Sequence, residues 1–265
     1  MTEPHLSDSP VSTPRVSIVI PAYNEDQSIV VTLERLTDAV TLPHELLVVV
    51  DNVDDATIPV FEKVADAFPS ARLLVQTYGR GPANAIRFGM DTAAAPVVVV
   101  TMADGSDDVR VIDDLVRLVE RGCVVAAASR YMPGGQQIGG PRLKKLMSET
   151  AGRSLHVLAG VGTRDATNSF KAYSTEFVRR VGVESRDGFE LGIELVAKAR
   201  RLRLPIAEIP TVWLDRDAGT SNFQLRKWLP EYLHWYRFAY GRRLTYDDIA
   251  RRPRAADTPE GQEHA

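Results

Sequence analysis

Short apolar runs alternate with amphipathic segments through the first 130 residues, and this alternation limits the possible folds most strongly. The run Val97–Val100 is apolar at every position, which predicts a strand buried on both faces. In residues 25–40, Ile29, Leu33 and Leu36 recur at helical spacing. Strands separated by helices of about ten to fifteen residues predict βαβ units. We therefore expect an α/β protein with a mostly parallel, Rossmann-like sheet covered by helices on both faces.

The second half of the sequence is less regular than the first. In the first half we expect strands at 16–20, 45–50, 71–76, 96–101 and 123–128, and helices at 25–40, 55–68, 82–92 and 109–121. In the second half we expect a glycine-rich loop at 131–141, helices at 143–159, 175–181 and 189–201, strands at 169–173 and 206–213, and an amphipathic segment at 224–240. Pro230 should lie near the start of a helix in that last segment. No linker-like stretch separates the halves, which predicts a single domain over 15–245.

Composition excludes several classes of protein. The chain has 265 residues and a net charge of −3, which gives no electrostatic footprint for nucleic acid. Its one cysteine, Cys123, rules out an internal disulfide framework and fits a cytoplasmic protein. No apolar run reaches the roughly 18 residues of a membrane span. Residues 1–14 are expected to form a disordered leader and not a signal peptide, and 251–265 a disordered tail.

Polar and glycine residues gather directly after the predicted strands. Ligands of parallel α/β sheets bind beyond the carboxyl ends of the strands, so these residues are candidates for a site. They are Pro21, Tyr23, Asn24 and Glu25 after the first strand, Asp51 and Asp54 after the second, Gly79, Gly81 and Asn84 after the third, Asp104, Asp107 and Asp108 after the fourth, and Arg130 after the fifth.

Helix capping explains only part of this set. Asn24, Asp54 and Asp108 could each cap the helix that follows. Asp51 and Asp104, however, precede the predicted helix starts by several positions. The glycines of GRGPAN (79–84) could be turn formers, and their spacing matches neither a Walker nor a Rossmann motif.

Carboxylates at a strand end suit a divalent cation, because Mg²⁺ is usually held by one or two carboxylates together with phosphate oxygens and water. Asp104 is best placed for this role, and Asp107 could assist it.

Eight stretches, taken in order, resemble a known family. They are VSIVIPAYNE (16–25), VVVDNVDDAT (48–57), GRGPANAIRFG (79–89), VVVVTMADGSDD (97–108), SRYMPGG (129–135), RDATNSFKAY (164–173), GFELGIEL (188–195) and IPTVWLDRDAGTSNF (209–223). Through them the chain resembles family 2 glycosyltransferases of GT-A fold, in the dolichol-phosphate mannosyltransferase-like branch.

The resemblance implies an inverting transfer of mannose or glucose from a nucleotide sugar such as GDP-mannose or UDP-glucose. It also implies Mg²⁺ or Mn²⁺ and a polyprenyl (dolichyl or undecaprenyl) phosphate acceptor, with a nucleotide-binding half over 15–130 and an acceptor-binding half over 131–245. By position, the donor side would comprise Pro21, Tyr23, Glu25, Asp51, Gly81, Asn84, Ala103, Asp104 and Ser106. The metal residues would be Asp104 and Asp107, and the catalytic residues Asp104, Arg130, Glu190 and Arg216.

Two positions depart from the family pattern. Met102 stands where the motif has its first carboxylate, and a thioether is a poor ligand for a hard cation. Asn222 stands where this branch often has lysine. The first departure makes metal dependence an open question, and it leaves room for a nucleotide-sugar-binding protein without catalytic activity. The second removes one expected contact to an acceptor phosphate.

Two kinds of acceptor remain open. A lipid phosphate is already charged, so cations would have to screen it from the donor; the candidates are Arg130, Arg142, Lys144, Lys145 and Arg216. The 142–145 cluster could equally be a solvated helix face. A soluble sugar or phosphoglycerate hydroxyl would need a general base instead, and Glu190, which shares a helix face with Glu194, is the candidate.

The aromatic segment 224–240 has two possible roles. Its Trp, Tyr and Arg side chains suit peripheral contact with the inner face of a cell membrane, while its helical spacing also suits packing onto the sheet. Both could hold on different sides of one helix. His156 and His234 have no partners at ligand spacing, so we do not expect them to bind metal.

Overall fold

A seven-stranded sheet forms the centre of the computed structural model, which describes residues 13–186, 188–215 and 225–252. In spatial order the strands are β3 (Ala71–Val75), β2 (His44–Val50), β1 (Val16–Pro21), β4 (Val97–Val100), β7 (Lys171–Ser174), β5 (Val125–Ser129) and β8 (Ile206–Pro210). Strand β7 is antiparallel to both of its neighbours, and the other pairs are parallel. The predicted mostly parallel sheet is confirmed.

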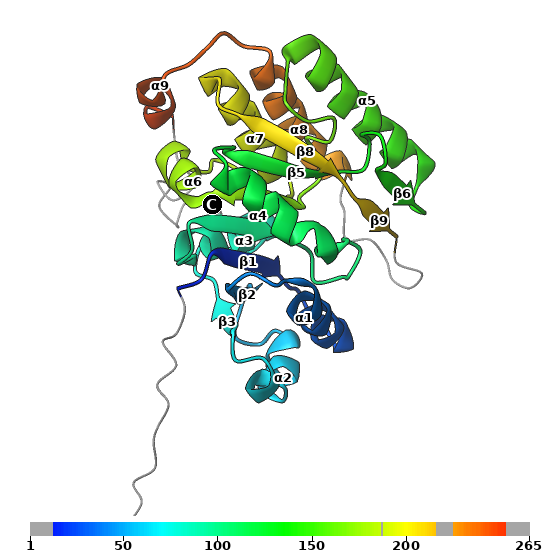
Figure 1. The fold of residues 1–265 in the computed structure, drawn as a ribbon, viewed down its shortest axis with the longest axis vertical. Coiled ribbons are helices and arrows are strands. Elements are labelled where there is room, and N and C mark those ends of the chain that lie inside the picture. The colour runs from blue at the N-terminus through cyan, green and yellow to red at the C-terminus, as the bar shows by residue number, and fades with distance from the viewer. Residues whose placement is uncertain (1–12, 187, 216–224, 253–265) are drawn as a thin grey trace, which may run out of the picture.

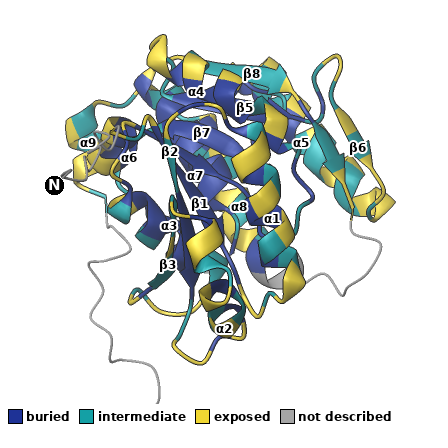
Figure 2. Ribbon diagram, turned by 60° about the horizontal axis from the view of Figure 1, so that its bottom comes forward, coloured by how far each residue is buried: buried dark blue, intermediate teal, exposed yellow. Residues whose placement is uncertain are grey.

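Helices cover both faces of this sheet (Figure 1). The helices are α1 (Gln27–Ala39), α2 (Thr57–Glu62), α3 (Pro82–Thr92), α4 (Ile112–Glu120), α5 (Arg142–Ala159), α6 (Thr175–Val181), α7 (Leu191–Leu202), α8 (Leu225–Ala239) and α9 (Tyr246–Ala250). Helices α1, α2 and α4 pack in one core, and α3, α6, α7 and α8 pack in the other. The central strands are buried, and exposed residues lie on the outer helix faces and loops (Figure 2).

Three details of the strands and of helix α2 differ from the sequence-based expectation. The predicted helix at 55–68 is shorter, because α2 ends at Glu62 and a 3-10 turn follows at Ala65–Ala67. The glycine-rich loop contains strand β6 (Gln136–Ile138), which pairs with β9 (Val212–Leu214). The predicted strand at 206–213 is therefore divided. The break falls at Thr211. Its N–H donates to the carbonyl of Ser129 in β5, and its carbonyl accepts from the N–H of Gln136 in β6.

Helix α8 passes through Pro230 and does not begin near it. Proline removes one backbone hydrogen bond, and here it lies on the exposed side of the helix. Burial of Trp228 and Trp235 on the opposite side offsets that cost. The fold also continues past residue 245, because Ile249 of α9 is buried in the same core.

The carboxyl ends of the parallel strands meet at one edge of the sheet. Val19 of β1 pairs with Val100 of β4, and Val50 of β2 pairs with Val75 of β3. Strand β7 runs the other way, so its first residue, Lys171, lies at this same edge opposite Val100 and Ala127. The antiparallel strand therefore brings a lysine in among the strand ends.

Candidate active site

A buried carboxylate, Asp55, ties together the loops after β1 and β2. It accepts hydrogen bonds from the backbone N–H of Asn24 (3.1 Å) and of Thr57 (2.9 Å). Asn24, at φ +50°, accepts in turn from the N–H of Ala56 (3.2 Å). The side chain of Tyr23 is left exposed at the tip of this loop. Asn24 therefore joins two loops and does not cap its own helix.

Asp51 joins the end of β2 to the turn before α3. Its carboxylate accepts from the side-chain amide of Gln76 (3.0 Å) and from the N–H of Gly81 (3.1 Å). Gly81, at φ +130°, is the N-cap of α3, and Asn84 is buried in the first turn of that helix. Three of the predicted donor residues, Asp51, Gly81 and Asn84, thus lie together at this end of the sheet.

The loop that contains Asp104 is held from behind by α1. The guanidinium of Arg35 donates to the carbonyl of Gly105 (2.5 Å) and to that of Asp107 (3.0 Å), and the hydroxyl of Thr32 donates to the carbonyl of Ala103 (2.8 Å). Within the loop, the Asp104 carboxylate accepts from the N–H (2.9 Å) and the hydroxyl (2.6 Å) of Ser106. Asp104 and Ser106 are therefore fixed as one unit.

Asp107 is buried behind Asp104. Its carboxylate accepts from the hydroxyl of Thr101 (3.0 Å) and the N–H of Met102 (3.3 Å). Burial and the nearby charge of Asp104 raise its pKa to about 6. A bound cation would reduce the repulsion between these two carboxylates.

A divalent ion fits this loop only in part. Among the described residues, no group of three His, Cys, Asp or Glu side chains could hold a metal ion. This agrees with the presence of Met102 at the first position of the motif. The side chain of Asp104 is only partly buried, whereas Asp107 is buried and its Oδ2 is already bonded to Thr101 and Met102. Such a donor set suits an ion that takes its remaining ligands from phosphate and water.

Strand β9 is joined to the same loop. The N–H of Leu214 donates to the carbonyl of Ser106 (3.0 Å), and Asp107 forms an antiparallel β-bridge with Trp213. The second half of the chain therefore touches the predicted metal loop directly, and no local sequence pattern indicated this contact.

Arg130 is paired with Asp165, a residue that lies 35 positions further along the chain. Its Nε and Nη2 donate to the two carboxylate oxygens (2.8 and 2.9 Å), and its backbone N–H donates to the same group (2.9 Å). Nη2 also donates to the hydroxyl of Ser148 on α5 (3.3 Å). Burial alone would raise the pKa of Asp165, but the charge and hydrogen bonds of Arg130 hold it below its usual range. The predicted phosphate-facing arginine is thus held in a bidentate ion pair.

Lys171 is fully buried, and the charges of Arg130 and Asp165 both act on it. Its ammonium donates to the carbonyls of Ala166 (3.2 Å) and Asn168. Burial lowers the pKa of Lys171 to about 7, although the negative charges of Asp165 and Asp107 act to raise it. Asp107, Arg130, Asp165 and Lys171 therefore influence one another electrostatically, although they come from three separate segments.

Glu190 is buried at the start of α7. Its Oε1 accepts from the N–H of Gly188 (3.3 Å). A Cβ at Gly188 would come within 2.6 Å of Glu190 Oε2 and 2.7 Å of the Trp228 ring, which places α8 against this carboxylate. Burial and the charge of Glu190 raise the pKa of Tyr232, and the charge of Arg130 opposes this shift. Glu190 and Arg130 therefore both act on one phenol of α8.

Glu194, on the same helix face as Glu190, has a different environment. It accepts from the N–H of Ser185 (2.9 Å) and forms a buried ion pair with Lys198 (2.6 Å). Both of its oxygens are used to hold the loop before α7, so its interactions are structural.

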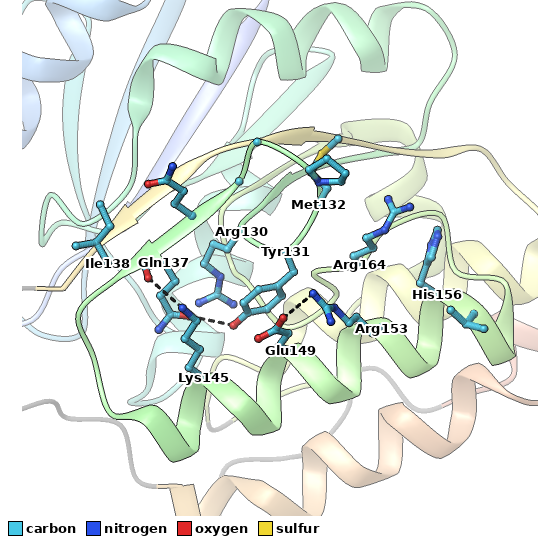
Figure 3. Close-up of a pocket in the computed structure, with 15 residues that line it drawn as sticks. Arg130, Tyr131, Met132, Gln137, Ile138, Lys145, Glu149, Arg153, His156 and Arg164 are labelled. Atoms are coloured by element: carbon cyan, nitrogen blue, oxygen red, sulfur yellow. Dashed lines mark hydrogen bonds and ion pairs between the residues drawn. The ribbon is translucent and has the colours of Figure 1, made fainter.

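An open cavity of about 860 Å³ lies beside Arg130, between the segment 130–138 and α5 (Figure 3). Its basic lining residues are Arg130, Lys145, Arg153 and Arg164. Lys145 donates to the carbonyl of Gln137 (3.3 Å), and the hydroxyl of Tyr131 donates to the Gln137 side chain (3.0 Å). Of the predicted acceptor-side cations, Arg130 and Lys145 line this cavity. Arg142 is exposed at the start of α5, and Arg216 lies outside the described residues.

Sequence reasoning brought the strand-end residues together but missed the side chains that hold them. Asp55 and Asp165 stood inside quoted motifs without an assigned role. For Arg35 and Lys171 no sequence signal exists, because their partners are backbone carbonyls that only the folded chain brings near.

The sequence of this chain is similar to those of known proteins over most of its length. The model of the family "Glycosyl transferase family 2" matches residues 17–182. Polyprenol monophosphomannose synthase of Mycolicibacterium smegmatis is 29% identical over 216 residues, which are 79% of this chain and 81% of the relative. Undecaprenyl-phosphate mannosyltransferase of Micrococcus luteus is 30% identical over 216 residues, which are 78% of this chain and 87% of the relative.

Solved structures share the fold. Glucosyl-3-phosphoglycerate synthase from Mycobacterium tuberculosis, in complex with Mn²⁺, UDP-glucose and phosphoglyceric acid, matches with a TM-score of 0.63 at 17% identity, over 84% of this chain and 80% of that one. A mannosyltransferase from Pyrobaculum calidifontis, in complex with GDP-Man and Mn²⁺, matches with a TM-score of 0.59 at 18% identity, over 84% and 63%. At these identities the likeness shows the GT-A fold alone. The family match, which covers more than half of the sequence, shows that this chain is a glycosyltransferase and belongs to glycosyl transferase family 2.

Proposed function

We propose that the protein transfers a hexosyl group, which we infer to be mannosyl, from a nucleotide sugar to a polyprenyl phosphate with inversion at the anomeric carbon. One observation carries the proposal: the similarity to two polyprenyl-phosphate mannosyltransferases extends through both halves of the chain. The strand-end arrangement supports it, because donor-side residues and the Arg130–Asp165 pair lie at one edge of the sheet.

On the donor side, we assign a role to each predicted residue. Tyr23 and the loop that Asp55 holds would contact the base, with Pro21 and Glu25 shaping that loop. Asp51, Gly81 and Asn84 would contact the ribose and the nearer phosphate. Asp104 and Ser106, with Ala103 behind them, would face the diphosphate. The hydrogen bonds that already fix these loops would reduce the entropy lost when the donor binds.

Asp104 is the residue we propose to hold Mg²⁺ or Mn²⁺, with Asp107 acting behind it. When bound, the ion supplies positive charge that stabilises the departing nucleoside diphosphate. The like-charged pair Asp104 and Asp107 supports this assignment, since the pKa of Asp107 is raised partly by its neighbour.

On the acceptor side, a phosphate monoester needs no general base. One of its oxygens would form the bond to the anomeric carbon as the bond to the diphosphate oxygen breaks. Arg130, kept in place by Asp165, would screen two anions from each other, and Arg216 would assist from the segment outside the described residues. With such an acceptor, Glu190 would position Tyr232 and Gly188 and would not abstract a proton.

A transfer assay with two acceptors tests the proposal. The purified protein is given radiolabelled GDP-mannose or UDP-glucose with Mn²⁺ and either undecaprenyl phosphate or 3-phosphoglycerate. We expect the label to enter the organic phase. Label that appears only in water-soluble product would establish the phosphoglycerate alternative, and no transfer from either donor to either acceptor would contradict the proposal.

The matched variants for this assay are Asp104→Asn and Asp108→Asn. Asp104→Asn should lower the transfer rate by about a thousandfold, the scale of losing one charge-stabilising group. Asp108 caps the 3-10 turn at Val109 and pairs with Arg110, so Asp108→Asn should keep nearly full activity. Equal loss in both variants would contradict the role of Asp104.

A further inference from the structure

An open cavity of about 760 Å³ lies beside the start of strand β8, away from the candidate active site. Its wall is built from three segments, at 159–162 after α5, at 200–206 between α7 and β8, and at 240–243 after α8. Strand β8 begins in this wall at Ile206 and ends at Pro210, which pairs with Ser129, the residue before Arg130. At about 3.3 Å per residue, these two ends of β8 lie about 13 Å apart. The cavity is therefore separate from the residues assigned to sugar transfer.

Arginine dominates the chemistry of this hollow, which we call the arginine cavity. Among the described residues that line it, none is Asp or Glu and five are arginines: Arg200, Arg201, Arg203, Arg242 and Arg243. In the part of the chain that the structure describes, none of the five forms an ion pair. This concentration of unbalanced positive charge occurs in a chain whose net charge is −3.

Backbone carbonyls hold the two half-buried arginines in place. Nε of Arg200 donates to the carbonyl of Ala159 (2.7 Å), and its Nη1 donates to that of Gly241 (2.6 Å). Nε of Arg201 donates to the carbonyl of Arg242 (2.8 Å). A guanidinium has five N–H donors, so these bonds fix each group and leave part of it available to an anion.

The arginines also repel one another. Burial lowers the pKa of Arg201, and the positive charges of Arg252 and Arg200 lower it further. Asp248 acts in the opposite direction, but its Oδ2 already accepts from the N–H and the hydroxyl of Thr245. A bound anion would reduce the repulsion within this group of cations.

The C-terminal end of α7 accounts for only part of this charge. Arg200 and Arg201 lie in the last turn of that helix, where cations interact favourably with the helix dipole. The dipole is equivalent to about half a negative charge, however, and the wall carries five positive ones. Arg242 and Arg243 belong to a different segment, after α8. The charge that remains suits an anion with several negative charges.

We propose that the arginine cavity binds a soluble oligophosphate, that is, a compound with two or more linked phosphate groups. Guanidinium groups match phosphate oxygens in pairs, and the cavity volume lies in the range of small-molecule sites. A single phosphate group carries about two negative charges at neutral pH, too few to balance this wall. The site is independent of the proposed transfer reaction, because no lining residue has a role on the donor or the acceptor side.

Calorimetric titration of the full chain with inorganic triphosphate tests the proposal. The protein is first freed of divalent ions on a chelating resin, so that no metal can hold the anion at Asp104. We expect one triphosphate per chain, bound at least about tenfold more tightly than orthophosphate and more weakly as salt is added. Failure of the wild type to bind triphosphate, or equal affinity for orthophosphate, would overturn the proposal.

The variant Arg203→Gln/Arg243→Gln removes two exposed cations from the cavity. Its affinity for triphosphate should fall about tenfold or more, because hydrogen bonds between charged groups are lost. Lys63→Gln/Arg72→Gln removes two exposed cations near β3, at the far side of the sheet, and should bind as the wild type does. Undiminished affinity in the first variant, or equal loss in both, would contradict the assignment.

A milder variant guards against misfolding. Arg242→Gln changes one exposed side chain of the wall and should lower the affinity severalfold. The melting temperature of each variant without ligand should match that of the wild type. If Arg242→Gln folds and binds triphosphate with full affinity, the arginine cavity is not the site.

Two further measurements locate the anion. Lys145→Gln/Arg153→Gln removes two cations from the cavity beside Arg130 and should leave the affinity unchanged. Loss of affinity in that variant, with Arg203→Gln/Arg243→Gln unaffected, would place the anion beside the candidate active site and refute the proposal. Binding of phosphatidylglycerol vesicles that depends on Arg203 and Arg243, without binding of free triphosphate, would assign the cavity to a lipid phosphate and overturn its assignment to a soluble compound.

Discussion

The two halves of the molecule hold their site residues in different ways. In the first half, acids at the strand ends accept hydrogen bonds mainly from the backbone: Asp55 from Asn24 and Thr57, and Asp51 from Gly81. In the second half, Asp165 is paired with Arg130 and the strand-end lysine, Lys171, is wholly buried. The strand ends of the first half therefore depend on loop geometry, while those of the second half depend on the balance of buried charge. Substitutions that change charge but preserve shape should separate the two halves most clearly.

The largest expected difference compares Asp165→Asn with Asp55→Asn. Asp165→Asn leaves the guanidinium of Arg130 buried without its counter-charge, which should cost roughly 3–5 kcal/mol of unfolding free energy. Asp55→Asn keeps an oxygen that accepts from backbone N–H groups, so it should cost about 1 kcal/mol. Urea denaturation of the two variants measures both values. Equal losses would show that the halves do not differ in this respect.

The next effect concerns Lys171 and pH. Its pKa, about 7 in the folded protein, lies below the ordinary lysine value of 10.5, so above pH 7 the unfolded chain binds a proton that the native state does not. Stability should therefore rise with pH, by up to about 1.4 kcal/mol per unit between roughly pH 7.5 and 9.5. Below pH 7 both states are protonated and this slope disappears.

Lys171→Met should flatten that rise, because it removes the group while the charges of Asp165, Arg130 and Asp107 remain. Lys63→Met, at an exposed position after α2, is the control and should keep the wild-type slope. Unfolding free energies across the pH range decide the matter; a slope that survives in Lys171→Met would assign it to another group.

A smaller effect is expected from Met102→Asp in the loop that contains Asp104. Restoring a carboxylate beside Asp104 should raise the affinity for Mn²⁺ in the presence of a nucleoside diphosphate by about tenfold. Without metal the new acid should repel Asp107 and lower the melting temperature. Calorimetric titration with Mn²⁺ measures the first effect, and Met102→Leu, which adds no ligand, should bind as the wild type does. Unchanged affinity in Met102→Asp would mean that the ion does not lie at this loop.

The smallest expected effect comes from a comparison of two glycines with positive φ. Gly105 (φ +70°) and Gly122 (φ +105°) should each lose about 1–2 kcal/mol of stability when changed to alanine. Only at Gly105 does the added Cβ meet another group, Arg35 Nη1, at 2.9 Å; at Gly122 nothing lies within 4 Å. We therefore expect Gly105→Ala alone to raise the KM for the donor a few-fold. A raised KM in both variants would mean that Arg35 does not position the Asp104 loop.

The same contrast explains what the sequence could predict. The alternation of apolar strands and helices predicted the parallel part of the sheet, and the strand ends led to Asp51, Gly81 and Asp104, because local patterns determine both. Strand β6 was missed because pairing with β9, 76 residues away, creates it. The partner of Arg130 was missed for the same reason. For segment 224–240 the sequence left both membrane contact and packing onto the sheet open, and only the structure shows that Trp228 and Trp235 are on the buried side of α8.

Strand β7 has a consequence for the order in which the polypeptide can acquire its shape. Strand β5 meets β4 only through β7, so when residues 125–129 leave the ribosome they have no neighbour in the sheet until residues 171–174 have been synthesised. A fragment that ended at residue 130 would leave one side of the four valines of β4 without a hydrogen-bonded neighbour, and we expect it to aggregate. The nascent protein can therefore complete its sheet only after most of its length has been translated.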